Sequence, residues 1–405
     1  MPLNLLRWLP AFRDMDYEQQ AVVTDSLKSG GLLVYGPAGS GKTAIALYSG
    51  KTLSDLGKSF KVFVFTNVLM NFIKAGASDL QLPSDCVTTF YRWARQQHEL
   101  QIGYPPDTGE DKFSLWVDNL IRHWTRNPSQ TPRYDYVLVD EAQDFKDNVA
   151  RLLHMISPNV LVVADPSQSL YVDTKDRATL IQRWNPLSGY GEIPNNYRNP
   201  RSVARVATLF LDPTTSTPAD FMGRVKGRAH EGKPIWYQVT NADEQTDRIC
   251  GLIEKARGSI RIGILYRHQR DLEQEQIRLQ RRGARIQVAL SKTSGYDFNN
   301  PVPVLTTVHS AKGLEFDCVI LPSLNEYSWD GDANDRKERN LFFVALTRTK
   351  VELYFISRKG SECAFLKEIL ERDPDSVQSP LVPSPMKSFA STVAPNAFDD
   401  TDDPF

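Results

Sequence analysis

Cysteine and histidine, the residues that most often build disulfide frameworks and metal sites, are scarce in this chain of 405 residues. Its four cysteines include no CxxC pair, and its six histidines include no HxxxH or HExxH spacing. This pattern argues against a zinc ribbon, an iron–sulfur cluster and a disulfide framework. A long apolar run is also lacking, because Arg7 interrupts the run at 5–9 and Arg13 follows it. We therefore expect neither a signal peptide nor a membrane span.

An excess of charge of one sign is absent as well, because 48 basic side chains are balanced by 49 acidic ones. No overall attraction to nucleic acid or to an anionic membrane follows, so any such ligand has to bind a local patch. Apolar residues make up 41% of the chain, which excludes a collagen, a coiled coil and a wholly disordered chain. The length predicts about two to three domains. We expect a reduced, cytoplasmic protein.

Short, continuous apolar runs are the main signal of secondary structure. In the first half of the chain they lie at 32–35, 62–65, 136–139 and 160–163. Continuous apolarity suits strands that are buried on both faces of a parallel sheet. Strand-like segments follow at 235–239, 262–266, 286–290, 302–307, 318–321 and 353–356. Because helix-like segments lie between them, the pattern predicts an α/β fold with two parallel-sheet lobes.

The lobes are divided by a stretch that contains proline, glycine and serine. We place the first lobe at 1–188, with a small insertion at about 95–133, and the second lobe at 189–372. We expect the remaining residues, 373–405, to form a disordered tail. A segment this rich in proline and aspartate cannot bury enough apolar surface to offset the entropy of the chain.

The segment at 36–43 satisfies the pattern GxxxxGK[ST] directly after an apolar run. Glycines let backbone amides turn inward toward an anion, and the N-terminus of a following helix adds partial positive charge. Lys42 supplies a cation to the β- and γ-phosphates, and the hydroxyl of Thr43 suits Mg²⁺. A glycine-rich turn without a ligand is the alternative. The expected ATP-binding residues here are Gly36, Pro37, Ala38, Gly39, Ser40, Gly41, Lys42 and Thr43.

An acidic pair, Asp140 and Glu141, follows the apolar run at 136–139. The carboxyl end of a buried strand is where ligands bind in open α/β sheets. We expect Asp140 to hold the metal through water and Glu141 to accept a proton from the attacking water. On its own, such a pair could equally be a solvated loop. The phosphate-binding pattern upstream favours catalysis.

The segment Val139–Asp144, with the sequence Val-Asp-Glu-Ala-Gln-Asp, resembles the Walker B motif of superfamily 1 helicases of the UvrD/Rep/PcrA type. Further segments follow that family's order of motifs over roughly residues 15–357. The resemblance implies two RecA-like lobes of the P-loop NTPase class, with ATP and Mg²⁺ as cofactors. It also implies single-stranded DNA as the partner.

The same resemblance assigns further nucleotide contacts. It implies that Gln19 reads adenine, that Tyr197 stacks on adenine, and that Gln168 senses the γ-phosphate. Arg198 and Arg348 reach the γ-phosphate in that family, and Gly313 and Glu315 belong to its motif V. Together with the residues above, the implied catalytic set is Lys42, Asp140, Glu141, Gln168, Arg198 and Arg348, with Thr43 and Asp140 at the metal.

Other motifs of this resemblance imply contacts with DNA, through Thr66, Asn67, Thr89, Phe90, Tyr171 and His309. The chain departs from the family after Tyr171, where it has no further aromatic residue, so one base-stacking platform is missing. Tyr171, Phe90, Tyr91 and Trp93 are candidate replacements, and burial in the core is their alternative. Basic residues at 267–270 and 278–285 either follow a phosphate backbone or form a solvated helix face.

The family's two accessory domains do not fit between these motifs at full size, which leaves duplex separation less firmly implied than ATP hydrolysis. We interpret the chain as an ATP-dependent DNA helicase or translocase that acts on single-stranded DNA in replication, recombination or repair. The alternative is a DNA-stimulated ATPase subunit that regulates a partner nuclease in a bacterial anti-phage complex. No nuclease motif is evident in the chain itself.

The last residues form a separate signal. Asp399–Phe405 resembles the acidic tip of bacterial single-stranded-DNA-binding protein, which ends in aspartates followed by Pro-Phe. Asp403 departs from that tip, which has an apolar residue at this position. We expect this tip to dock onto proteins that bind the single-stranded-DNA-binding protein. A solubilising acidic tail, or occlusion of the DNA channel, is the alternative.

Overall fold

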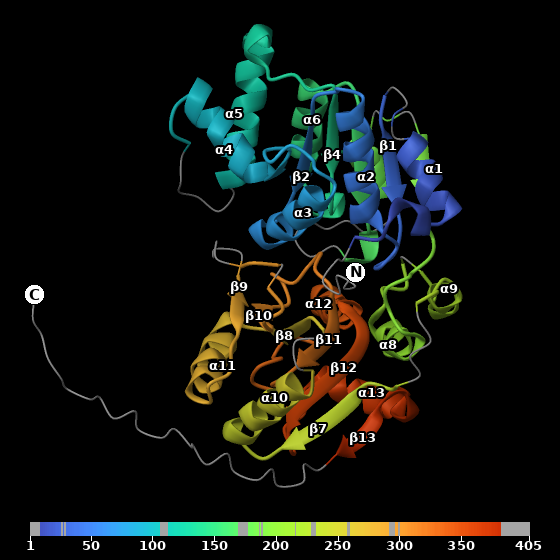
Figure 1. Cartoon of the computed structure of the whole chain (residues 1–405), viewed down its shortest axis with the longest axis vertical. Coiled ribbons are helices and arrows are strands. Elements are labelled where there is room, and N and C mark those ends of the chain that lie inside the picture. The colour runs from blue at the N-terminus through green and yellow to red at the C-terminus, as the bar shows by residue number, and fades with distance from the viewer. Residues whose placement is uncertain are drawn as a thin grey trace, which may run out of the picture.

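Two parallel sheets lie one above the other along the long axis of the molecule (Figure 1). The computed structural model describes residues 9–25, 27, 30–105, 112–168, 177–185, 187, 189–214, 216–227, 232–256, 260–290, 296–298 and 300–381. Within each sheet every pairing between neighbouring strands is parallel. The predicted α/β fold with two parallel-sheet lobes is confirmed.

The first sheet is buried on both faces, as its continuous apolar runs predict. Its strand order is β3 (Val87–Thr89), β2 (Phe60–Val64), β4 (Tyr136–Val139), β5 (Val160–Ala164), β1 (Leu32–Tyr35) and β6 (Gly189–Glu192). Leu32 and Val34 face one core, whereas Leu33 and Tyr35 face the other. The first core is shared with α1 (Tyr17–Asp25), α2 (Lys42–Asp55) and α3 (Asn67–Asp79). The second is shared with α4 (Phe90–Gln101), α5 (Lys112–Arg126), α6 (Asp147–Ile156) and α7 (Arg177–Trp184).

The second sheet has the order β13 (Gln378–Leu381), β7 (Ile235–Val239), β12 (Thr349–Arg358), β11 (Phe316–Leu321), β8 (Ile262–Tyr266), β10 (Val304–Thr307) and β9 (Gln287–Ala289). One face packs on α10 (Ala242–Ala256) and α11 (Gln269–Arg281). The other packs on α8 (Arg201–Ala207), α9 (Pro218–Gly223), α12 (Arg336–Thr347) and α13 (Ala364–Arg372). The core on this latter face is continuous with the core that Leu32 and Val34 face in the first lobe. The centre of the Phe72 ring lies 4.4 Å from that of the Phe298 ring.

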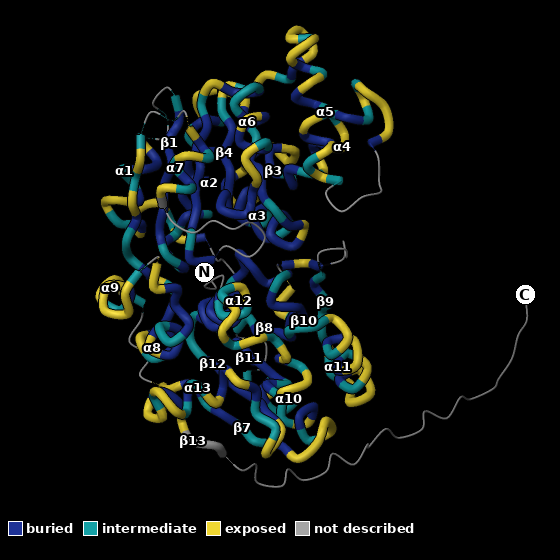
Figure 2. Tube along the Cα trace, turned by 180° about the vertical axis from the view of Figure 1, so that it is seen from behind, coloured by how far each residue is buried: buried dark blue, intermediate teal, exposed yellow. Residues whose placement is uncertain are grey.

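Buried residues follow the strands of both sheets, and exposed ones gather on the outer helices (Figure 2). Short 3₁₀ turns connect the elements, among them η1 (Phe12–Asp14), η2 (Pro128–Gln130), η3 (Ala142–Asp144), η4 (Pro166–Gln168) and η5 (Thr208–Phe210). None of the described helices combines the length and the apolarity that crossing a membrane requires.

Two of the expected boundaries are wrong by a few residues. Strand β6 pairs with β1, so the first lobe extends to Glu192 instead of ending at 188. The glycine-rich sequence Gly189–Glu192 has no apolar run and forms an edge strand, which is why the pattern missed it. At the other end, η6 (Pro374–Ser376) and β13 belong to the second lobe, since β13 pairs with β7. The rest of the expected tail, 382–405, lies outside the described residues.

Candidate functional site

The phosphate-binding pattern forms the turn between β1 and α2. Gly39 and Gly41 have positive φ angles of 74° and 86°, which L-residues with a side chain rarely adopt. The turn is also closely packed. A Cβ atom on Gly39 would lie 2.4 Å from the Cβ atom of Arg198, and one on Gly41 would lie 2.6 Å from Nε2 of Gln19. The glycines therefore allow segments of both lobes to approach the turn.

Lys42 begins α2 with its ammonium group folded back over this turn. Its Nζ atom donates to the carbonyl oxygens of Gly36 (2.8 Å) and Pro37 (2.9 Å) and lies 3.7 Å from Oδ2 of Asp165. Burial lowers the pKa of Lys42, while the nearby carboxylates, Asp165 first among them, oppose that effect. The site thus holds a buried cation at the N-terminus of a helix, where an anion is favoured.

The predicted metal pair is in contact. The hydroxyl of Thr43 donates to Oδ2 of Asp140 at 2.7 Å, and Asp140 is fully buried. Burial and the charge of the adjacent Glu141 raise the pKa of Asp140. A hydroxyl and a carboxylate at this spacing are hard oxygen donors, the kind that Mg²⁺ prefers, and a divalent cation would offset the crowded negative charge. The residues present therefore fit Mg²⁺. Among the described residues, no group of three or more His, Cys, Asp or Glu side chains could hold a metal.

Glu141 turns its backbone sharply after β4. Its φ angle is +54°, an uncommon value for a residue with a side chain, and its N–H group donates to Oδ1 of Asp140 at 2.9 Å. Its Oε2 atom accepts from Nε2 of Gln143 at 2.5 Å and lies 3.8 Å from Nζ of Lys312. Although burial opposes ionisation, Lys312 and Lys42 hold the pKa of Glu141 below its usual value.

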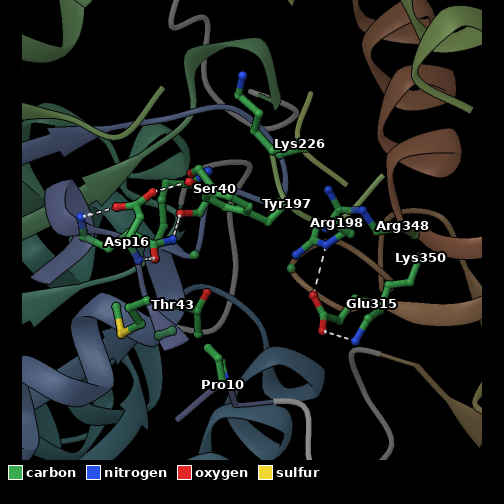
Figure 3. Close-up of a pocket in the computed structure, with 18 of the residues that line it drawn as sticks. Pro10, Asp16, Ser40, Thr43, Tyr197, Arg198, Lys226, Glu315, Arg348 and Lys350 are labelled. Atoms are coloured by element: carbon green, nitrogen blue, oxygen red, sulfur yellow. Dashed lines mark hydrogen bonds and ion pairs between the residues drawn. The ribbon is translucent and has the colours of Figure 1, made fainter. Parts of the chain in front are cut away.

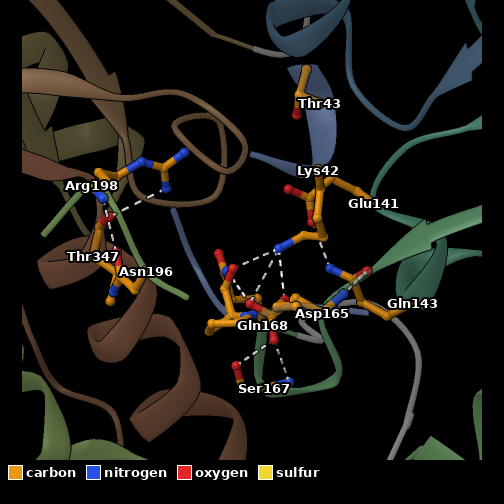
Figure 4. Close-up of polar contacts among 12 residues, drawn as sticks. Lys42, Thr43, Glu141, Gln143, Asp165, Ser167, Gln168, Asn196, Arg198 and Thr347 are labelled. Atoms are coloured by element: carbon orange, nitrogen blue, oxygen red, sulfur yellow. Dashed lines mark hydrogen bonds and ion pairs between the residues drawn. The ribbon is translucent and has the colours of Figure 1, made fainter. Parts of the chain in front are cut away.

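A chain of polar contacts leads from Glu141 toward the second lobe (Figure 4). Oε1 of Gln143 accepts from the backbone N–H of Asp165 at 3.0 Å, and Oδ2 of Asp165 accepts from Nε2 of Gln168 at 2.5 Å. Oε1 of Gln168 in turn accepts from a terminal nitrogen of Arg348. The amide of Gln168 therefore joins Asp165 in the first lobe to Arg348 in the second.

Arg348 is buried without a carboxylate partner among the described residues. Its guanidinium donates to the carbonyl oxygens of Val344 (3.1 Å) and Leu314 (3.2 Å) and to the side-chain oxygen of Gln168. Burial and the neighbouring Arg198 lower the pKa of Arg348. A guanidinium held only by neutral acceptors leaves a buried positive charge that an anion would compensate.

Lys312 is a residue of the site that the sequence analysis did not assign. It lies on the loop after β10 and is almost fully buried. Its ammonium group donates to Oδ2 of Asp144 at 2.5 Å and to the backbone oxygen of Gln168. This ion pair crosses between the lobes beside Glu141. Asp144 ends the segment Val139–Asp144 and Lys312 directly precedes Gly313, but only the folded chain brings the two side chains together.

Arg198 approaches the site from the segment after β6 (Figure 3). Its Nε atom donates to Oε2 of Glu315 at 3.0 Å, and Lys350 donates to Oε1 of the same carboxylate at 3.1 Å. Burial would raise the pKa of Glu315, but Lys350 and Arg198 together hold it at about 2. Glu315 is therefore an ionised acceptor between two cations.

The opposite end of the cavity is formed by Gln19 and Tyr197. The side chain of Gln19 donates to the backbone oxygen of Ser40 at 2.8 Å and accepts from the N–H group of Asp16 at 2.9 Å. The hydroxyl of Tyr197 donates to Oδ2 of Asp16, and its ring is 40% exposed. These contacts tie the start of α1 to the phosphate turn and leave an aromatic surface at the edge of the cavity.

A single cavity of about 660 Å³ brings most of these predicted residues together. It is lined from both lobes by Gln19, Ala38, Gly39, Ser40, Gly41, Lys42, Thr43, Glu141, Gln168, Tyr197, Arg198, Gly313, Glu315 and Arg348. Gly36 and Pro37 accept from Lys42 behind this lining, and Asp140 is reached through Thr43. The volume is in the range of ligand pockets. Asp16, Lys226 and Lys350 also line it and were not predicted.

The residues expected to contact DNA are less well supported by their positions than the residues expected to contact the nucleotide. Phe90 is fully buried and packs against Phe63 and Trp93, so its assignment as a DNA contact is wrong and the core alternative holds. Thr66 and Thr89 are buried helix caps, whose hydroxyls accept from backbone N–H groups of α3 and α4. Asn67 is exposed and His309 is half-buried, and Tyr171 lies outside the described residues.

The basic segments of the second lobe are mostly paired with acids. Arg267 forms a two-pronged ion pair with Glu338, and Arg278 pairs with the buried Glu275. Arg282 lies within ion-pair distance of both Asp243 and Asp247. These pairs favour the interpretation as a helix face over that of a phosphate track.

Two segments of the chain match known families. Residues 269–360 match the model described as UvrD-like helicase C-terminal domain, and residues 19–174 match the model of an AAA domain. These matches confirm the resemblance to UvrD-like helicases. A protein of Mycoplasma pneumoniae named "Probable DNA helicase" is 26% identical over 251 residues, which cover 56% of this chain and 44% of that protein.

DNA helicase IV of Escherichia coli is 24% identical over 286 residues, which cover 61% of this chain and 37% of that protein. The matched region thus spans less than half of the length of either relative. A solved structure, the C-terminal domain of a possible DNA helicase from Lactobacillus plantarum WCFS1, aligns at 19% identity with a TM-score of 0.33, over 43% of this chain and 93% of that one.

Proposed function

We propose that this chain hydrolyses Mg-ATP between its two lobes and uses the cycle to move along single-stranded DNA. One observation carries the proposal: Lys42 and Glu141 from one lobe and Arg348 from the other line the same cavity. A triphosphate bound there would contact both lobes, so its hydrolysis would alter how they hold each other. The matches to UvrD-like helicase and AAA domains support the same assignment.

The phosphate turn and Lys42 bind the β- and γ-phosphates in this proposal. The N–H groups at the start of α2 point toward the anion, and Lys42 exchanges its contacts with Gly36 and Pro37 for phosphate oxygens. Thr43 and Asp140 would hold Mg²⁺. When bound, Mg²⁺ neutralises charge on the transferring phosphoryl group.

Glu141 is the general base of the proposed reaction. Its carboxylate is kept ionised by Lys312 and Lys42 and oriented by the amide of Gln143, so it can take a proton from the attacking water. Its backbone conformation places this carboxylate at the wall of the cavity. Strain of this kind concentrates at functional sites.

Arg198 and Arg348 stabilise the negative charge that develops on the γ-phosphoryl group. Arg348 has neutral acceptors only, so the phosphate would supply the anion that its buried guanidinium lacks among the described residues. Gln168 contacts Arg348 and so registers whether the γ-phosphate is present. Gln19 and the exposed ring of Tyr197 take the adenine.

The test measures ATP turnover by the purified chain with and without single-stranded DNA. Wild type is expected to turn over ATP and to be stimulated more by single strands than by duplex. Glu141→Gln should still bind nucleotide while turnover falls at least a hundredfold, because the base is lost with little change in shape. Glu371→Gln, the same change at an exposed position near the end of α13, is the matched control and should turn over ATP as wild type does. Near-normal turnover by Glu141→Gln would contradict the assignment.

A second candidate is a DNA-stimulated ATPase that regulates a partner nuclease in anti-phage defence. In the interval between β3 and β4, where large relatives of the resembled family carry an accessory domain, the described residues form only α4, α5 and η2, which favours a motor that works with a partner. Strand displacement by the chain alone separates the candidates. Displacement supports the helicase, whereas ATPase stimulation without displacement supports the regulatory subunit.

The tip Asp399–Phe405, outside the described residues, stays a proposed docking segment for proteins that bind the single-stranded-DNA-binding protein. Deleting Phe405 should abolish capture of such a protein while ATP turnover is retained. Unchanged capture would remove this proposal, and a sharp rise in turnover would favour occlusion of the DNA channel instead.

A further inference from the structure

A series of aromatic rings leads from the site to the surface of the first lobe. The ring of Phe145 lies 5.5 Å from that of Phe65, which lies 5.9 Å from that of Tyr91. The ring of Tyr91 lies 4.6 Å from that of Phe113, at an angle of 41°. The inner end, Phe145, directly follows Asp144, the partner of Lys312. The outer end, Phe113, is on α5.

The outer end is exposed although the helix face that carries it is buried. Phe113 precedes the buried Trp116 and Val117 by one helical turn, so it lies on the same side of α5. Yet 41% of Phe113 is accessible. Figure 1 shows α4 and α5 beside each other at the edge of the first lobe. Tyr91, on α4, is half-buried beneath Phe113.

Two lysines flank the exposed ring. Nζ of Lys112 lies 5.6 Å from the centre of the Phe113 ring, and Nζ of Lys146 donates to the hydroxyl of Ser114 at 3.2 Å. Lys146 is exposed at the start of α6. An exposed ring beside two cations matches the chemistry of a nucleotide strand, whose bases stack on rings and whose phosphates pair with ammonium groups.

We propose that Phe113 and Tyr91, with Lys112 and Lys146, bind single-stranded nucleic acid. A base stacks on the exposed ring of Phe113 in place of the ammonium group of Lys112, and the lysines neutralise the phosphates on either side of it. The inference rests on the proposed function, because it assumes that the chain acts on single strands. It supplies a stacking platform in place of the aromatic residue that the chain lacks after Tyr171. Phe113, Lys112 and Lys146 were not among the predicted contacts.

The experiment measures binding of a fluorescently labelled oligothymidine by anisotropy at several salt concentrations. Loss of one stacked base weakens binding by roughly 5-fold to 150-fold, so Phe113→Ala is expected to lie in that range. Phe113→Leu keeps the apolar packing without an aromatic face and should bind as weakly, whereas Phe113→Trp should restore affinity. Lys112→Met with Lys146→Met should lower the slope of log K against log salt by about 0.7 for each lost phosphate contact.

Leu115→Ala is the matched control. Leu115 is 40% exposed, close to the value for Phe113, but it is two residues away and lies on the other side of α5. It should bind oligothymidine as wild type does. Thermal unfolding of each variant verifies that the fold is retained, and Phe113→Leu serves if Phe113→Ala unfolds.

Three results would overturn the assignment. If wild type, Phe113→Leu and Leu115→Ala all bind the oligonucleotide equally well, the assignment of Phe113 as a stacking platform is wrong while the proposed function stands. If wild type binds no single strand at all, both are wrong. If wild type associates with itself in sedimentation and Phe113→Leu abolishes that association without changing DNA affinity, the surface is a contact between copies of the chain.

Discussion

Replacing Lys312 by Met tests whether the ion pair between the lobes supports catalysis. Lys312 and Asp144 are both almost fully buried, and their charged atoms are 2.5 Å apart. Met keeps most of the volume of the lysine stem but leaves the carboxylate of Asp144 buried without its cation. Breaking a buried pair by removing one partner costs about 3–5 kcal/mol.

This cost falls on the arrangement in which the lobes are in contact, because Lys312 and Asp144 belong to different lobes. If turnover requires that arrangement, kcat/KM for ATP should fall by about two to four orders of magnitude, since each 1.4 kcal/mol is about tenfold. The loss of Lys312 also removes the cation that does most to lower the pKa of Glu141. Both effects lower kcat/KM for ATP.

The assay is steady-state ATP turnover of four proteins: wild type, Lys312→Met, Asp144→Asn and the double variant. The double variant leaves no unpaired buried charge at this position, so it should be less impaired than the sum of the single changes, by about 0.5–3 kcal/mol. Thermal unfolding of each protein separates lost catalysis from lost folding. Additive effects, or turnover by Lys312→Met equal to that of wild type, would refute the reasoning.

Two further predictions concern the metal pair and the half-buried His309. Thr43→Val removes the hydroxyl that donates to Asp140 at 2.7 Å with little change in shape. ATP turnover should therefore fall about tenfold to a hundredfold and require a higher Mg²⁺ concentration. An unchanged Mg²⁺ titration would contradict this prediction. Burial, with Arg267 nearby, lowers the pKa of His309 to about 4, so the unfolded chain takes up the proton first as pH falls. Wild type should therefore lose up to about 2 kcal/mol of unfolding free energy relative to His309→Asn between pH 7 and 5, as measured by urea unfolding; parallel pH profiles would contradict it.

Most of the fold could be predicted because the strands of a doubly covered sheet must be continuously apolar. The runs at 136–139 and 235–239 coincide with β4 and β7, and the run at 262–266 with β8. Strand β6 was not predicted, because an edge strand pairs through its backbone on one side only and needs no apolar run. Most residues that line the cavity could be predicted because phosphate chemistry restricts which residues can stand in the turn.

The cross-lobe contacts could not be predicted in the same way. Asp144 and Lys312 are 168 positions apart, and no local pattern tells a lysine that pairs across a lobe interface from one on the surface. Phe90 shows the opposite case: its motif suggests a contact with DNA, but packing against Phe63 and Trp93 decides its place. For single aromatic side chains, burial is set by tertiary packing and not by sequence context.

Four cations of the site, Lys42, Lys312, Arg198 and Arg348, are not equivalent, and under the proposed function their differences predict where the γ-phosphate would be sensed. Lys42, Lys312 and Arg198 each have a carboxylate within ion-pair distance, so a triphosphate would only replace or share an existing partner. Arg348 is held by neutral oxygens in the described part of the chain, so a bound anion changes its energy most. Its contact with Gln168, which also donates to Asp165, passes that change to the first lobe. Arg348 and Gln168 are therefore the residues through which gain and loss of the γ-phosphate would be converted into closing and opening of the lobes.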